Sequence, residues 1–222
     1  MKKSLPILEF KQVSKNFGSQ RILEEISFKI YPQEFVFLVG PSGAGKTSIF
    51  RLLSREILPS DGEIFFDQKT LSDLGICDLR RRIGRVFQDL KLISDRTVFE
   101  NIQIALDVAG GYQNPTEEIK KVIDWVGLKE KKHLFPAQLA EGEKQRVGIA
   151  RALISAPEVL LVDEPTSNLD SNNAWKIIKL LKDINKKGAT VVIATHDEDI
   201  LNSLEDRTII LSKESKEKDE NN

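Results

Sequence analysis

The spacing of apolar residues along the chain predicts strands in its first third and again near its end. Alternating apolar and polar residues at 7–13 and 26–30 predict strands, with a turn at 15–18 between them. A short apolar run of β-favouring residues at 34–39 predicts another strand. The fully apolar run at 159–162 is typical of a parallel strand that is buried on both faces.

From residue 89 to about 156 the apolar spacing becomes helical, as at 98–106 and 119–126. Thr116 is expected to cap the start of the second of these helices. Strands return at 190–195 and 207–211. The pattern therefore predicts an α/β core with a helical insert.

Residues 40–47, with the sequence GPSGAGKT, match the phosphate-loop pattern G-x-x-x-x-G-K-[ST] between a predicted strand and a predicted helix. Glycines let backbone N–H groups turn toward phosphate oxygens, and the helix start adds its positive dipole end. Lys46 would reach the β- and γ-phosphates, and the Thr47 hydroxyl would bind Mg²⁺. A glycine-rich turn with an incidental lysine is the alternative, which the strand and helix context disfavours. The loop predicts nucleotide triphosphate binding without saying what the nucleotide drives.

Composition excludes several classes of function. The chain has 222 residues, 40% hydrophobic and 30% charged, which is ordinary for a soluble globular protein. A formal net charge of -1 gives no basic footprint for nucleic acid. The single cysteine, Cys77, allows neither an intramolecular disulfide nor a thiol metal cluster. No apolar run approaches the roughly 18–20 residues of a spanning helix, so we expect a cytoplasmic protein that reaches a membrane only through a partner.

Carboxylates follow the apolar run at 159–162, where the carboxyl end of a parallel strand would open into the site. Asp163 would hold the hydration shell of Mg²⁺, and Glu164 would polarise the attacking water. Two acids that merely close a strand in solvent would be the simpler explanation without a phosphate loop nearby. His196 follows the strand predicted at 190–195 and is expected at the same sheet edge. Phe17 is either a platform for the adenine ring or a hydrophobic plug.

The phosphate loop is followed in order by Gln88, the segment 139–146, the Asp163-Glu164 strand end, the segment 167–170 and His196. In this order the chain resembles the ATP-binding cassette family over roughly 7–211. The resemblance implies a RecA-like P-loop core with an antiparallel β-subdomain and an inserted helical subdomain.

The same resemblance implies a single domain at 7–211, with core and β-subdomain at 7–88 and 157–211 and the helical subdomain at 89–156. The charged residues 212–222 contain no apolar residue and are expected to form a disordered tail. In the family, two copies clamp two ATP molecules head to tail, so an ATP-dependent homodimer is expected.

The resemblance implies a role for each matching position. Glu164 resembles the catalytic base, and His196 resembles the histidine that contacts the γ-phosphate. Gln88 resembles the glutamine that senses Mg²⁺ and the membrane partner. Asp170 ends the segment that crosses the dimer interface. The expected metal positions are Thr47, Gln88 and Asp163. The expected ATP-binding positions are Phe17, Gly40, Pro41, Ser42, Gly43, Ala44, Gly45, Lys46, Thr47, Ser48, Ala140, Gly142, Glu143 and Asp170.

A finer resemblance is to the cell-division subgroup of the family, through the segment 95–101 and the helix at 174–181 that contains Trp175. It implies an integral membrane partner of the FtsX type, with ATP use on the inner face of the cell membrane coupled to control of cell-wall hydrolases outside. Relatives that serve lipoprotein release or macrolide export share most of these motifs, so both remain alternatives.

The signature segment departs from the family pattern, which reads Leu-Ser-Gly-Gly followed by Gln or Glu. This chain has Leu-Ala-Glu-Gly-Glu at 139–143. Ala140 lacks the hydroxyl that would bind the γ-phosphate of the opposite subunit, and Glu141 brings a carboxylate toward phosphate. We expect ATP binding by the single chain to be intact and dimer closure and turnover to be slow or partner-dependent.

Two functions follow from these observations. In the first, the chain is an ATPase subunit in which Glu164 positions water and dimer closure moves a membrane partner. In the second, it is an ATP-gated assembly module with little hydrolysis, which the altered signature favours. The intact base, metal site and His196 favour the ATPase.

Overall fold

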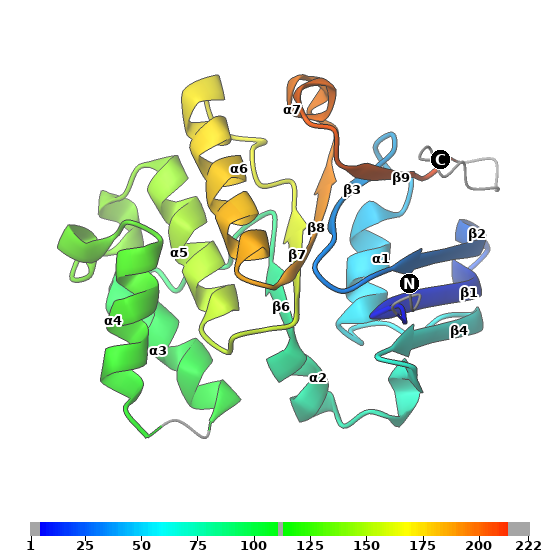
Figure 1. Ribbon diagram of the computed structural model, residues 1–222, viewed down its shortest axis with the longest axis horizontal. Helices are drawn as coiled ribbons and strands as arrows, with labels where there is room; N and C mark the ends of the chain where they lie inside the picture. Colours follow the sequence, from blue (N-terminus) through cyan, green and yellow to red (C-terminus); the bar gives the residue numbers. More distant parts are fainter. Residues whose placement is uncertain (1–4, 111–112, 213–222) are drawn as a thin grey trace.

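The computed structural model describes residues 5–110 and 113–212. Two sheets and a group of helices make up this part of the chain (Figure 1). The strands are β1 (Leu8–Phe17), β2 (Gln20–Ile30), β3 (Phe35–Val39), β4 (Asp61–Phe66), β5 (Lys69–Thr70), β6 (Ile83–Val86), β7 (Val159–Asp163), β8 (Thr190–Thr195) and β9 (Arg207–Ile210). The α-helices are α1 (Lys46–Leu53), α2 (Ile76–Arg82), α3 (Val98–Ala109), α4 (Pro115–Trp125), α5 (Glu141–Leu153), α6 (Ser171–Lys186) and α7 (Glu198–Ser203).

A five-stranded sheet with the order β6-β7-β8-β3-β9 forms the centre of the molecule, and its neighbouring strands pair in parallel. Every residue of β7 and of β8 is buried, which confirms the expectation for 159–162. Parallel strands require crossover connections, and their carboxyl ends meet at one sheet edge. That edge therefore receives the residues that follow β3, β7 and β8.

Both faces of the parallel sheet are covered, because alternate residues along each strand point to opposite faces. Phe37 of β3 and Leu160 of β7 pack with α3, α4, α5 and α6 in one core cluster. Leu38 and Leu161 pack instead with α1, α2 and the antiparallel sheet in a second cluster. The sheet is thus the layer between two apolar cores.

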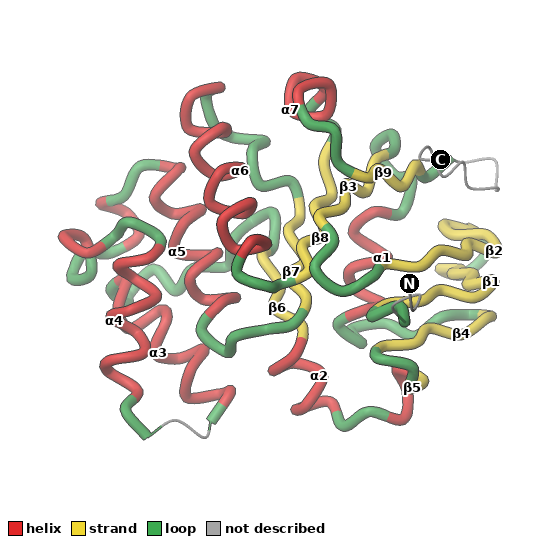
Figure 2. The backbone as a smooth tube through the Cα atoms, viewed as in Figure 1, coloured by secondary structure: helices red, strands yellow, loops and turns green. Residues whose placement is uncertain are grey.

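The antiparallel sheet has the order β2-β1-β4-β5 and lies on the opposite side of the molecule from α3, α4 and α5 (Figure 2). The turn predicted at 15–18 lies instead at 18–19, because β1 continues to Phe17 and pairs it with Gln20. Register shifts in the β1–β2 ladder and the left-handed backbone of Gln12 mark irregular pairing. Such bulges break the alternation on which a sequence prediction of strand length depends.

The predicted helices at 98–106 and 119–126 are confirmed by α3 and α4. The predicted cap at Thr116 is wrong: α4 starts at Pro115, with Asn114 as the N-cap residue. Proline is favoured at the first helical position because its missing N–H has no partner there in any case. At α3, Thr97 and Glu100 form a capping box.

Among residues 5–110 and 113–212, no helix is both long and apolar enough to cross a membrane. The expected tail at 212–222 lies, except for Ser212, outside the described residues. The division of the domain into subdomains at 7–88, 89–156 and 157–211 stays a prediction.

Candidate functional site

Residues 40–45 connect β3 to α1 at the carboxyl edge of the parallel sheet. Gly43 and Gly45 have φ angles of 79° and 97°, which favour glycine. A Cβ atom on Gly45 would lie 2.4 Å from Cδ2 of Leu23, and one on Gly40 would lie 2.7 Å from the carbonyl oxygen of Leu211. The loop therefore needs glycine both for its backbone conformation and for its close approach to β2 and to the segment after β9.

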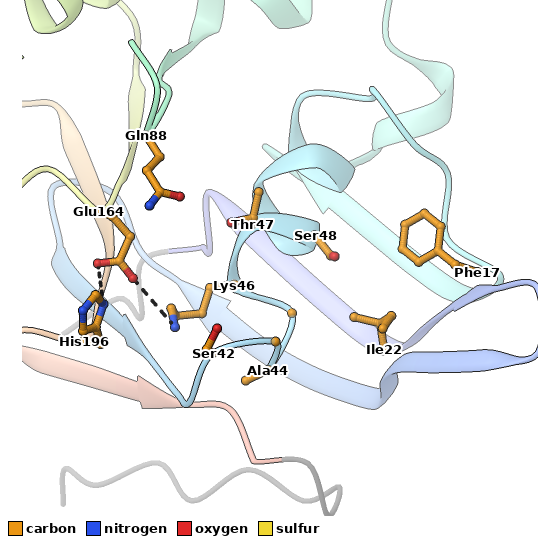
Figure 3. A pocket seen from close by; sticks show the side chains of 12 residues that line it. Phe17, Ile22, Ser42, Ala44, Lys46, Thr47, Ser48, Gln88, Glu164 and His196 are labelled. Carbon is orange, nitrogen blue, oxygen red and sulfur yellow. Dashed lines mark ion pairs between the residues drawn. The ribbon is translucent and has the colours of Figure 1, made fainter. Parts of the chain in front are cut away.

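A cavity of about 560 Å³, here called the nucleotide cavity, opens at this loop (Figure 3). It gathers residues from distant parts of the sequence: Phe17 lies on one side, and Glu164 and His196 lie on the other. The lining residues are Phe17, Ile22, Ser42, Gly43, Ala44, Gly45, Lys46, Thr47, Ser48, Gln88, Glu164 and His196. Ile22 has no motif in the sequence that marks it, and its place follows from the β1–β2 hairpin.

Lys46 is the first residue of α1, and only 8% of it is exposed. Its Nζ donates a hydrogen bond to the carbonyl oxygen of Gly40 at 2.6 Å and lies 3.8 Å from Oε1 of Glu164. A buried ammonium is costly unless it is paired. The loop carbonyl and the Glu164 carboxylate compensate this charge at the wall of the cavity, where a phosphate group would be its natural partner.

Glu164 follows β7 and has a left-handed backbone with a φ angle of 47°. Its N–H donates to the carbonyl oxygen of Ala194 in β8 at 2.8 Å. This bond holds Glu164 at the sheet edge, with its carboxylate turned into the cavity (Figure 3). Oε2 of Glu164 lies 2.9 Å from Nδ1 of His196, whose side chain is 68% exposed. The histidine therefore orients a nearly buried carboxylate from the solvent side.

Asp163 is 2% exposed and lies behind Thr47, whose Oγ1 is 3.4 Å from Oδ1 of the aspartate. Burial raises the pKa of the Asp163 carboxyl, and the hydrogen bond from Thr47 acts in the opposite direction. No cluster of three or more His, Cys, Asp or Glu side chains suited to a metal occurs in the described residues. Mg²⁺ fits this donor set nonetheless, because it is commonly held by one or two carboxylates together with substrate phosphates and water.

The expected signature residues lie apart from the nucleotide cavity of the same chain. Ala140 is the N-cap residue of α5 and makes no side-chain cap, while its N–H donates to Oε2 of Glu143 at 3.0 Å. The hydrogen bond from Lys131 lowers the pKa of the Glu143 carboxyl. Glu141 forms an ion pair with Lys144 at 2.6 Å. Glu141, the carboxylate that the family pattern lacks, and Glu143 are thus both paired with lysines of their own chain.

Asp170 is the N-cap residue of α6 and accepts hydrogen bonds from N and Nδ2 of Asn173 at 3.0 and 2.6 Å. These bonds lower the pKa of the Asp170 carboxyl. Asn173 also faces the backbone of Gly142 in α5. Asp170, Ala140, Gly142 and Glu143 therefore gather at the start of α5 and α6, on a surface that a second protein chain can reach.

A third region is the groove between α2 and α3, here called the α2–α3 groove, with a cavity of about 470 Å³. Apolar side chains are exposed along it, with Val108 at 76% and Ile104 at 37%. Arg80 and Arg81 add positive charge to the same surface. An exposed apolar patch flanked by charge is typical of a docking surface.

Comparisons with known proteins agree with this geometry. A family profile described as "ABC transporter" matches residues 23–167. The cell division ATP-binding protein FtsE of Bacillus subtilis is 43% identical over 210 residues, covering 92% of this chain and 92% of that protein. FtsE of Escherichia coli K12 is 41% identical over 211 residues, covering 93% and 95%. A dimeric ATP-binding cassette solved in a post-hydrolysis state with ADP and Pi has a TM-score of 0.83 and 32% identity, covering 97% of this chain and 99% of that one.

Proposed function

We propose that this chain, which belongs to the ABC transporter family of ATP-binding domains, is the ATP-hydrolysing subunit of a membrane complex that acts in cell division. The expected fold class, a P-loop α/β core with an antiparallel sheet and added helices, is confirmed by the solved relative. The observation that carries the proposal is the meeting of the phosphate loop, Glu164, His196 and Gln88 in one cavity. The cell-division role rests on the FtsE relatives, which match over nearly their whole length.

ATP would lie with its base against Phe17 and its phosphates on the loop at 40–47. Lys46 and the loop N–H groups would stabilise the charge that develops during phosphoryl transfer. Glu164 would accept a hydrogen bond from the attacking water and orient it, with His196 holding the carboxylate. Mg²⁺, held by Thr47 and Asp163 with Gln88 nearby, would neutralise phosphate charge.

Two copies would associate head to tail, because the residues around the start of α5 and α6 lie outside the nucleotide cavity of their own chain. Placed against a second copy, Ala140, Gly142, Glu143 and Asp170 would complete its ATP site. The dimeric relative with bound ADP and Pi supports this arrangement. An ATP-gated assembly module with little hydrolysis is the second candidate, and the substitutions at Ala140 and Glu141 favour it.

The membrane partner would be an integral subunit of the FtsX type, so that the chain sits peripherally on the inner face of the cell membrane. The α2–α3 groove would receive an amphipathic segment of that subunit, with apolar side chains against Val108 and acidic ones against Arg80 and Arg81. Docking in the groove would be coupled to the nucleotide cavity, because Phe87 lines the groove and the next residue, Gln88, lines the nucleotide cavity.

Val108→Asp is expected to abolish stimulation of ATP hydrolysis by the membrane subunit, because a buried unpaired carboxylate opposes docking. Hydrolysis by the chain alone should stay within about twofold, since surface substitutions are usually near-neutral. The measurement is phosphate release by the chain with and without the membrane subunit in nanodiscs. Leu58→Asp, at another exposed apolar residue, is the matched control. Full stimulation of the Val108→Asp variant would contradict docking in this groove.

The double substitution Ala140→Ser/Glu141→Gly is expected to strengthen ATP-driven dimerisation about tenfold. A hydrogen bond to a charged group contributes about 1.5–3 kcal/mol, and removal of Glu141 takes away a like charge. Sedimentation of the purified chain with ATP, in a Glu164→Gln background, measures the dimer.

Restored turnover in the same double variant would show that the altered signature acts as a brake. The introduced serine hydroxyl would also cap α5, so the melting temperature of the monomer separates a gain in helix stability from a gain in dimer affinity. Glu117→Gly, which removes another exposed carboxylate in the first turn of a helix, is the control. An unchanged dimer would mean that residues 140 and 141 do not face nucleotide.

A further inference from the structure

The loop that carries Gln88 has a left-handed backbone at two consecutive residues that are not glycine. Leu90 and Lys91 have φ angles of 52° and 47°. Non-glycine residues persist in this conformation only where their surroundings hold them there. The N–H of Leu90 donates to the carbonyl oxygen of Phe87 at 3.0 Å, which closes a turn with Gln88 and Asp89 at its centre. Any shift of Leu90 therefore moves Gln88.

Arg151 of α5 binds both left-handed residues through their backbone. Its Nη1 donates to the carbonyl oxygen of Lys91 at 2.7 Å, and its Nη2 donates to that of Leu90 at 2.6 Å. A guanidinium presents parallel donors in a rigid plane, so it can hold two adjacent carbonyl groups at once. Burial lowers the pKa of the Arg151 guanidinium and the carboxylate of Asp89 raises it, but arginine stays charged in proteins.

The turn also packs directly on α5 beside this contact. A Cβ atom on Gly148, one turn before Arg151, would lie 2.9 Å from Cδ2 of Leu90. On its other sides the turn meets two cavities, because Gln88 lines the nucleotide cavity while Phe87 and Arg151 line the α2–α3 groove. The helix that starts at the signature segment thus holds the loop between the ATP site and the proposed docking surface.

We propose that Arg151 is a positioning residue for ATP hydrolysis: by holding the left-handed Leu90–Lys91 turn on α5, it places Gln88 in the nucleotide cavity. This inference rests on the proposed ATPase function. Nucleotide binding and turnover should depend on Arg151 differently. The phosphate loop and Phe17 bind nucleotide without the turn, whereas turnover needs Gln88 in place.

Arg151→Lys tests the contact, since an ammonium is a point charge and cannot hold two carbonyl groups in one plane. We expect kcat for ATP to fall about tenfold, because small displacements of an active-site group cost one to two orders of magnitude in rate. KM and the Kd for ATP should change by less than about twofold. If Arg151 only stabilised the domain, the substitution would lower the melting temperature and would leave kcat unchanged at temperatures below it.

A second substitution at Lys91, whose side chain is 60% exposed, tests whether Arg151→Lys lowers kcat through the turn. Glycine adopts positive φ freely, so Lys91→Gly should restore most of the kcat lost in Arg151→Lys. Lys91→Ala removes the same side chain but keeps the unfavourable backbone, so it should restore nothing. Equal effects of the two substitutions would overturn the inference.

Lys91→Pro reaches the same turn without touching a buried group, and it decides the matter if Arg151→Lys does not fold. Proline fixes φ near −65°, which is incompatible with the observed backbone, so the same loss of kcat at constant KM is expected. A wild-type rate in a folded Lys91→Pro variant would overturn the inference.

Amide hydrogen exchange distinguishes failure of this inference from failure of the proposed function. If the wild-type chain does not hydrolyse ATP, the proposed function fails, and exchange at 87–91 still tests the contact. Faster exchange there in Arg151→Lys or in Arg151→Gln than in the wild-type chain supports the role of Arg151. Unchanged exchange in a folded variant contradicts it.

Discussion

Lys46→Ala is expected to weaken ATP binding at least about a hundredfold. Its ammonium is nearly buried at the wall of the nucleotide cavity, where it now lies against the carbonyl oxygen of Gly40 and the carboxylate of Glu164. Charge-assisted hydrogen bonds contribute about 1.5–3 kcal/mol each, so the loss of two such bonds to phosphate corresponds to about two to four orders of magnitude in Kd. Without the lysine, Glu164 would also repel the phosphates.

Equilibrium binding of a fluorescent ATP analogue to the purified chain measures this loss. Lys69→Ala is the matched control, because Lys69 is exposed on the short strand β5, away from the cavity. ATP affinity within about threefold of the wild-type value in a folded Lys46→Ala variant would contradict the assignment of the phosphate site.

Glu164→Gln is expected to reduce kcat by about two to three orders of magnitude while ATP binding stays the same or tightens. An amide cannot act as a general base, and misplacing or removing such a group typically costs 10²–10⁴-fold in rate. The amide oxygen can still accept a hydrogen bond from Nδ1 of His196, so the geometry at 2.9 Å need not change. Loss of a carboxylate near phosphate favours binding.

Single-turnover hydrolysis at saturating Mg²⁺-ATP separates these two effects. Glu198→Gln removes an exposed carboxylate at the start of α7, two residues from His196, and should leave the rate unchanged. Equal hydrolysis by the wild-type chain and Glu164→Gln would favour the assembly module over the ATPase.

The features that could be predicted from the sequence are those that a short contiguous segment specifies. The phosphate loop at 40–47 matches a known sequence motif, and β7 is a fully apolar run, which is typical of a strand buried on both faces of the sheet. Asp163 and Glu164 follow from their place at the end of that run. The meeting of Glu164 and His196 in one cavity follows because the carboxyl ends of parallel strands share an edge.

Features that depend on particular long-range contacts, and not on a general rule of parallel sheets, could not be predicted. The extension of β1 through Phe17 depends on irregular pairing with β2. The left-handed backbone of Glu164 depends on its bond to Ala194 in β8. The hydrogen bonds from Arg151 join residues about 60 positions apart through backbone oxygens, which carry no side-chain signal.

The structure weakens, but does not remove, the repulsion of phosphate that the sequence of the signature segment suggests. The sequence places Glu141 where the family has glycine, which suggests repulsion of phosphate. In the structure Glu141 is paired with Lys144, and both side chains are partly exposed. Exposed ion pairs contribute only about 0–1 kcal/mol, so the pair moderates the carboxylate charge and leaves the lost serine hydroxyl uncompensated.

Whether Glu164 drives ATP hydrolysis is measured by the rate of phosphate release from Mg²⁺-ATP by the chain assembled with its membrane subunit. The wild-type complex and the Glu164→Gln complex are compared at saturating ATP, with bound nucleotide measured in the same samples. We expect turnover by the wild-type complex and at least about a hundredfold less by the variant at equal occupancy. Equal rates in the two complexes, with nucleotide bound in both, would contradict the role of Glu164 as the catalytic base.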